Sequence, residues 1–179
     1  MKMKRIVAIT AVAAMLAVVA GCGAKGGALD QASAKRPYDP NASFIPDDAV
    51  AMAANPGDPV LLATANEALD LVNEERGEAG LSDLSWSNGL AAAANVRAEE
   101  LTDAFSHTRP DGTDWYTVDA NIMFGENLAE FYNTPEEVVD AWMNSPSHKE
   151  NIMDGEFSTC GIAIYKDGGE YYWAQEFGY

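Results

Sequence analysis

Hydrophobic residues recur at helical spacing directly after residue 59, and this pattern predicts a helix of about 19 residues that ends near Gly80. The apolar positions that set the spacing are Leu61, Leu62, Ala65, Ala68, Leu69 and Val72. The alanine-rich segment AAAANVRAEEL predicts a second helix over about Ser87–Asp103. The first half of the region after residue 59 is therefore expected to be helical.

Two shorter helices are predicted next. Thr134 precedes Pro135 and, three positions on, Glu137. A threonine cap, a proline at the first helical position and a glutamate at the third form a helix start signal. Ser145 and the proline that follows it start a fourth helix, which carries His148.

The C-terminal third has the pattern of strands. Segments Gly161–Lys166 and Glu170–Phe177 flank a short turn with two glycines, which is typical of a hairpin. A further strand is predicted around Phe124–Phe131. Helices followed by a small antiparallel sheet predict one α+β domain over residues 60–179.

Residues 1–21 have the pattern of a secretory signal peptide. A basic start precedes the apolar run Ile6–Ala20, which is too short to span a membrane comfortably. The run closes with Val-Ala-Gly before Cys22, which resembles the lipobox of bacterial lipoproteins. That resemblance implies a lipid on the Cys22 thiol, which would hold the protein to the outer face of the cell membrane. The alternative is an ordinary signal peptide with an incidental cysteine.

Residues 22–59 are predicted to form a flexible tether. They hold five of the eight prolines and show no sustained hydrophobic period. The tether would carry the folded domain away from the lipid anchor, in an extracytoplasmic position.

The charge of the chain and its cysteine content exclude one class of partner and one kind of cross-link. The chain has 11 basic and 28 acidic residues, a formal charge of −17. Because so acidic a surface repels phosphate, nucleic acid is excluded as a partner. Cys160 is the only cysteine besides Cys22, so acylation of Cys22 leaves no intrachain disulfide. Cys160 is expected to be a small buried hydrophobic residue.

The candidate chemistry lies in His107, Glu126 and His148. The two histidines are the only ones in the chain, and Glu126 lies in the segment GENLA. Two imidazoles and a carboxylate could supply three ligands to zinc and leave a position for water. The same trio could work without metal, with the carboxylate orienting a histidine as general base. Since the histidines are far apart in sequence, spacing alone leaves open two unrelated histidines.

Four ordered motifs resemble one family. The segments HTRPDG (107–112), GENLA (125–129), SPSHKENI (145–152) and YYWAQEFG (171–178) together are similar to the bacterial branch of the CAP superfamily. The resemblance implies an α–β–α sandwich and a cleft shared by His107, Glu126 and His148. Eukaryotic members have a second cleft acid where this chain has Ser145, and Glu176 is a candidate substitute.

Two functions are left open by this resemblance. The first is a membrane-anchored module that binds a lipid, a glycan or a protein partner, with a cleft that takes a divalent metal such as zinc. The second is a metal-assisted hydrolase, a peptidase or cell-wall hydrolase, in which His107, Glu126 and His148 activate water. Binding is favoured because no self-sufficient catalytic motif occurs.

Other residues of these motifs are expected to have structural roles. Arg109 is expected to fix its loop by an ion pair or by carbonyl contacts, and Asn127 and Asn151 to hold the site by hydrogen bonds. Trp115, between two polar residues, is expected to be the exposed tryptophan.

Overall fold

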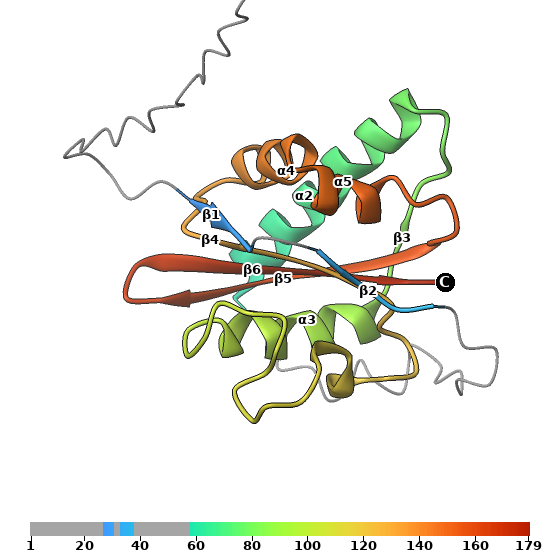
Figure 1. Ribbon diagram of the computed structural model, residues 1–179. Helices are drawn as coiled ribbons and strands as arrows, with labels where there is room; N and C mark the ends of the chain where they lie inside the picture. Colours follow the sequence, from blue (N-terminus) through green and yellow to red (C-terminus); the bar gives the residue numbers. More distant parts are fainter. Residues whose placement is uncertain (1–26, 31–32, 38–57) are drawn as a thin grey trace, which may run out of the picture.

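The computed structural model describes residues 27–30, 33–37 and 58–179 (Figure 1). The predicted signal peptide and Cys22 lie outside these ranges. Within them, four α-helices and a short 3₁₀-helix surround a mixed six-stranded sheet, which confirms the predicted α+β sandwich. No helix of these ranges is long and apolar enough to cross a membrane.

The sheet is built around three antiparallel strands. They are β4 (Gly125–Glu130), β6 (Glu170–Gly178) and β5 (Thr159–Asp167), in that spatial order. The two-residue strand β3 (Ser85–Trp86) pairs parallel to β5. At the opposite edge, β1 (Ala28–Leu29) and β2 (Ala34–Lys35) both pair antiparallel to β4.

Helices cover both faces of the sheet (Figure 1). One face carries α2 (Pro59–Glu78), α4 (Pro135–Asn144) and α5 (Pro146–Ile152), and the other carries α3 (Asn88–Glu100). The 3₁₀-helix η1 (Trp115–Val118) packs beside α3. The predicted helix starts are confirmed, since Thr134 accepts a hydrogen bond from the Glu137 amide and Ser87 from the Leu90 amide.

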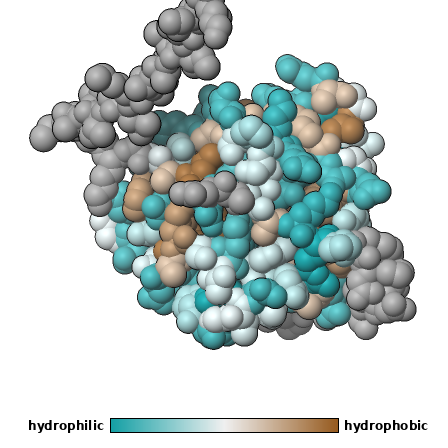
Figure 2. Space-filling model, in the orientation of Figure 1, coloured by the Kyte–Doolittle hydropathy of each residue, from teal (hydrophilic) through white to brown (hydrophobic). Residues whose placement is uncertain are grey.

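The core follows the alternation of side chains along the strands. In β4, Leu128 packs in the α3 layer and its neighbour Ala129 in the layer of α2, α4 and α5. Cys160 is completely buried, as predicted, and burial raises the pKa of its thiol. Outside the core, the face drawn in Figure 2 is largely hydrophilic, with hydrophobic residues in small separate areas.

The structure corrects the prediction of a flexible tether over all of residues 22–59. Ala28 and Leu29 pair with Glu130 and Ala129, and Ala34 and Lys35 pair with Glu126 and Gly125. Without the strands β1 and β2, the edge of β4 would have unpaired main-chain donors and acceptors, which can pair with a segment of any sequence. Because such pairing needs no hydrophobic period, the sequence pattern gave no sign of it.

The expectation for Trp115 is wrong. Its side chain is only 6% exposed and packs with Leu90, Ala93 and Met123. The η1 turn directs the indole beneath α3, although the neighbours of Trp115 in the sequence are polar.

Candidate functional site

The site is centred on Glu126 in strand β4. Glu126 lies two residues before Leu128, on the face of β4 that meets α3, and it is completely buried. Arg97 of α3 binds it with two groups: Nε donates to Oε2 at 2.7 Å and Nη2 to Oε1 at 3.3 Å. Burial disfavours the charged carboxylate, but hydrogen bonds from His107 and Arg97 outweigh it and lower the pKa of Glu126. Glu126 is therefore an ionised, fully paired carboxylate.

His107 lies on the other side of this carboxylate, in the loop after α3. Its Nδ1 is 2.6 Å from Oε1 of Glu126, and its Nε2 is 3.6 Å from Oδ2 of Asp30. Since ionised Glu126 only accepts hydrogen bonds, Nδ1 of His107 carries the proton. His107 thus joins the sheet core to Asp30 in the N-terminal segment.

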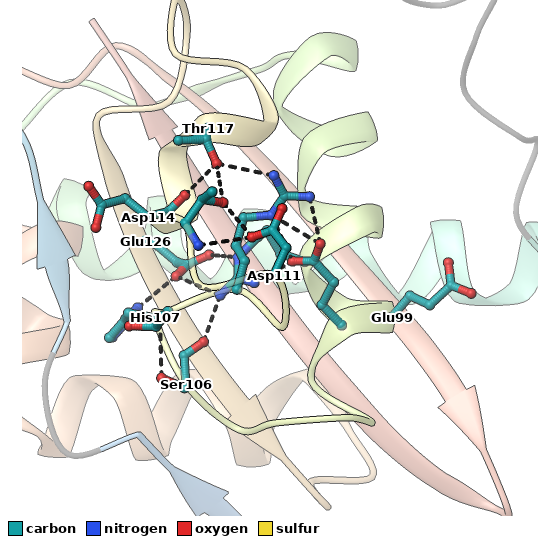
Figure 3. A network of polar contacts seen from close by, with 12 residues as sticks. Glu99, Ser106, His107, Asp111, Asp114, Thr117 and Glu126 are labelled. Carbon is teal, nitrogen blue, oxygen red and sulfur yellow. Dashed lines mark hydrogen bonds and ion pairs between the residues drawn. The ribbon is translucent and has the colours of Figure 1, made fainter.

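The pair of Glu126 with Arg97 belongs to a longer network of polar contacts, and Figure 3 shows the part of it around His107 and Glu126. Nη1 of Arg97 donates to Glu100 at 2.6 Å, and Arg109 binds the same carboxylate, also at 2.6 Å. Arg109 also donates to Thr117 at 3.1 Å, so the prediction that it fixes its loop is confirmed. The ionisable residues of this network are, in order of contact, Arg109, Glu100, Arg97, Glu126, His107 and Asp30.

Glu176 is the second acid of the site. It lies opposite Glu126 in the pairing of β4 with β6 and is completely buried. Among the described residues, neither of its carboxyl oxygens has a hydrogen-bond partner of good geometry. Burial and then the charge of Glu126 raise the pKa of Glu176 well above its ordinary value. Glu176 is therefore neutral.

His148 reaches the site from α5, on the other face of the sheet. Its Nδ1 is 2.8 Å from Oγ of Ser145, and its ring is completely buried. Within the described ranges, Nε2 has no hydrogen-bond partner. Burial, and then the nearby charge of His107, lowers the pKa of His148 to about 4. His148 is thus a neutral imidazole at pH 7, with an unsatisfied nitrogen.

Two asparagines hold α5 against β4. Asn127 donates to the carbonyl of His148 at 3.1 Å and to the side chain of Gln175 at 3.0 Å. Asn151 donates to Oδ1 of Asn127 at 3.1 Å and to the carbonyl of Glu126 at 3.2 Å. Both asparagines have the structural role that was predicted, and they fix the position of His148 relative to Glu126.

The three residues predicted from sequence are assembled at one strand, but their donors do not suit zinc. Both oxygens of Glu126 already accept hydrogen bonds from Arg97 and His107, so a metal would have to compete with these donors for the carboxylate. Among the described residues, no group of three or more His, Cys, Asp or Glu side chains is arranged to hold an ion. The residues present therefore do not fit a three-ligand zinc centre.

Arg97 and Asp30 were not predicted from the sequence. Arg97 had a usable signal: it falls at helical spacing on the buried stripe of Leu90, Ala94 and Leu101, where a charge requires a buried partner. Asp30 had none, because its position depends on the pairing of β1 and β2 with β4.

The fold and the site together define a class of protein: a mixed sheet lies between helical layers, and two histidines and a buried glutamate gather at the sheet. The model of the Cysteine-rich secretory protein (CAP) family matches residues 69–177, and the chain belongs to this family. It is 33% identical over 122 residues to "Uncharacterized protein YkwD" of Bacillus subtilis, covering 64% of this chain and 47% of that protein. The chain thus spans about half of this relative.

Solved structures show the same fold. An extracellular protein with an SCP domain from Bacillus anthracis is 24% identical, has a TM-score of 0.59, and matches over 70% of this chain and 45% of its own. An outer surface protein of Borrelia burgdorferi is 26% identical, has a TM-score of 0.56, and matches over 63% of this chain and 90% of its own.

Proposed function

We propose that this protein is a CAP-domain protein displayed outside the cell, which binds a ligand or partner through the site of His107 and His148. The observation that carries this proposal is the pairing of Glu126. Its charge is balanced by Arg97 and both of its oxygens are bound, so it is not free to activate water. Glu176 is neutral and buried, so it does not replace Glu126 as a base.

The location outside the cell rests on independent support. Residues 1–21 have the composition of a signal peptide, and Cys22 lies where a lipoprotein is acylated. The Bacillus anthracis and Borrelia burgdorferi structures are named as an extracellular protein and an outer surface protein. We infer that a lipid on Cys22 anchors the domain to the outer face of the membrane.

The unsatisfied nitrogen of His148 indicates what the site recognises. A buried ring nitrogen without a partner is costly, and where Nδ1 carries the proton, a ligand hydroxyl or amide that donates to Nε2 would remove the cost. Glycans and peptides carry such donors. A divalent metal would have to displace Arg97 or His107 from Glu126, so we assign the site no resident metal.

The hydrolase alternative rests on the same nitrogen. A neutral imidazole whose proton lies on Nδ1 leaves Nε2 able to accept a proton from water or a hydroxyl. In this alternative His148 is the base, while His107 and Glu126 are held in the charge network.

One experiment separates binding from hydrolysis. The full chain and His148→Gln are incubated with purified peptidoglycan, with phospholipid vesicles and with a pool of synthetic peptides, and both retention and released products are measured. We expect retention on at least one material, weakened at least tenfold by His148→Gln, and no released product. Asp103→Asn, an exposed acid outside the network, is the matched control. Retention on none of the materials, or products that depend on His148, would overturn the proposal.

A further inference from the structure

The N-terminal strap, residues 27–30 and 33–37, lies along the outer edge of β4 beside the site. Its pairs with β4 are antiparallel and flank the site at both ends: Leu29 with Ala129, and Ala34 with Glu126. The Arg36 amide extends this pairing by donating to the carbonyl of Phe124 at 2.7 Å. The strap is thus held as an extended peptide is held when it adds a strand to a sheet edge.

Asp30, the acidic residue of the strap, lies near the segments that carry His107 and His148. Asp30 lies 3.6 Å from Nε2 of His107, and its charge also acts on His148. Ser33 donates to the carbonyl of Ser147, the residue next to His148, at 2.6 Å. His148 is completely buried while the strap is in place. The strap therefore places a carboxylate and a hydroxyl where a ligand of the site would bind.

Arg36, a basic residue of the strap, is bound by main-chain carbonyls and aromatic rings. The guanidinium of Arg36 donates to the carbonyls of Ala120 at 2.7 Å and Met123 at 3.2 Å. It also lies over the rings of Tyr116 and Phe124, at 4.3 and 4.8 Å from their centroids. These carbonyls and ring faces all attract a cation, so this end of the edge is specific for a basic side chain.

The preceding side chain adds a second charge pair. Lys35 binds Asp154, in the turn after α5. Its ammonium also lies 5.1 Å from the centroid of the Phe157 ring. Partly exposed pairs of this kind define orientation more than they add stability.

We propose that the outer edge of β4 is a binding site for extended peptides that carry a carboxylate and, five or six residues later, a basic side chain. The chain's own strap occupies this site as an internal competitor. The inference deepens the proposed function, on which it rests, by naming an acidic-to-basic peptide as the ligand class. Because the strap belongs to the same chain, its effective concentration is high, and a free peptide must displace it, so the peptide binds more tightly when the strap is weakened.

The test uses a fluorescein-labelled peptide with the strap sequence, GALDQASAKRP, and fluorescence anisotropy on the full chain. Arg36→Ala weakens the strap at its basic position, and we expect this variant to bind the peptide at least tenfold more tightly than the unmodified chain does. Lys166→Ala, which removes an exposed lysine on β5, is expected to match the unmodified chain. A peptide that carries both Asp30→Asn and Arg36→Ala is expected to bind at least tenfold more weakly.

Failure of Arg36→Ala to bind the peptide while it unfolds cooperatively would overturn the inference, because the strap would then be a permanent part of the sheet. If Arg36→Ala does not fold, hydrogen exchange on the unmodified chain tests instead whether the strap opens more readily than the central sheet. The Arg36 amide is expected to exchange at least 100-fold faster than amides shared by β5 and β6, and equal protection overturns the inference. Retention of peptidoglycan or vesicles through His148 without peptide binding would sustain the proposed function and overturn only this inference.

Discussion

Glu126 and Glu176 lie directly opposite each other in the antiparallel pairing of β4 with β6, and both are completely buried. Two adjacent carboxyl groups in a core do not both ionise, because neither charge is screened by water. Arg97 and His107 bind Glu126 and hold the charge there. The proton is therefore retained by Glu176, whose pKa is raised.

Glu176→Gln should change how stability depends on pH. Because the folded pKa of Glu176 is above its unfolded value, its protonation contributes stability at low pH that is lost as the pH rises through the folded pKa. Glutamine stays neutral, so the stability of the variant relative to the unmodified chain should increase by up to about 1.4 kcal/mol per pH unit between the unfolded and the folded pKa of Glu176. Urea unfolding from pH 5 to pH 8 measures the difference. Glu156→Gln, at an exposed site, is the control, and equal slopes for Glu176→Gln and this control would contradict the prediction.

Arg97→Met should be severely destabilising. It leaves Glu126 charged and buried without its cation, which costs about 3–5 kcal/mol. Adding Glu126→Gln to this variant should restore part of the loss, since the buried charge is then gone. Arg109→Met, which breaks a partly exposed pair, should cost about 1 kcal/mol or less. Chemical unfolding of these variants and of Glu126→Gln alone gives the coupling energy, and additive losses would refute the buried pair.

His148 should make the fold sensitive to acid. Its folded pKa of about 4 is below its ordinary value of 6.5, so its contribution is complete above pH 6.5 and falls as the pH decreases towards 4. We expect the unmodified chain to lose on the order of 2 kcal/mol more than His148→Asn over this range. Unfolding at pH 7, 5.5 and 4 provides the measurement, and parallel losses in both proteins would be evidence against a buried neutral imidazole.

Gly161 sets the distance between α3 and the sheet. A Cβ at this position would lie 2.1 Å from the Ala91 amide nitrogen and 2.4 Å from the Leu90 carbonyl carbon, both of the helix backbone. Gly161→Ala should therefore cost about 3 kcal/mol or more, as the helix must move away from β5. Gly77→Ala is the matched control: a Cβ there meets nothing within 4 Å, so alanine should stabilise α2 by about 0.5–1 kcal/mol. Thermal unfolding compares the two variants, and similar melting temperatures would contradict the close contact.

Sequence patterns were sufficient to predict those elements whose structure depends on residues close together in the chain. The predicted helix from Thr134 has the expected cap, and the hairpin turns through Gly168 and Gly169 at φ of 58° and 91°. The ordered motifs also brought His107 and Glu126 into one site. The helix cap depends on a hydrogen bond between residues three apart, and the turn on glycines that adopt positive φ, so both are determined within a few residues.

The sequence by itself thus determined the helices, the central strands, the family and the residues that gather at the site. Only the tertiary structure decided that Arg97 neutralises Glu126, that Glu176 keeps its proton, and that the strap pairs with β4. The reason is physical. Charge states depend on burial and on partners from distant elements, and pairing with a sheet edge is made by the main chain, which every sequence shares.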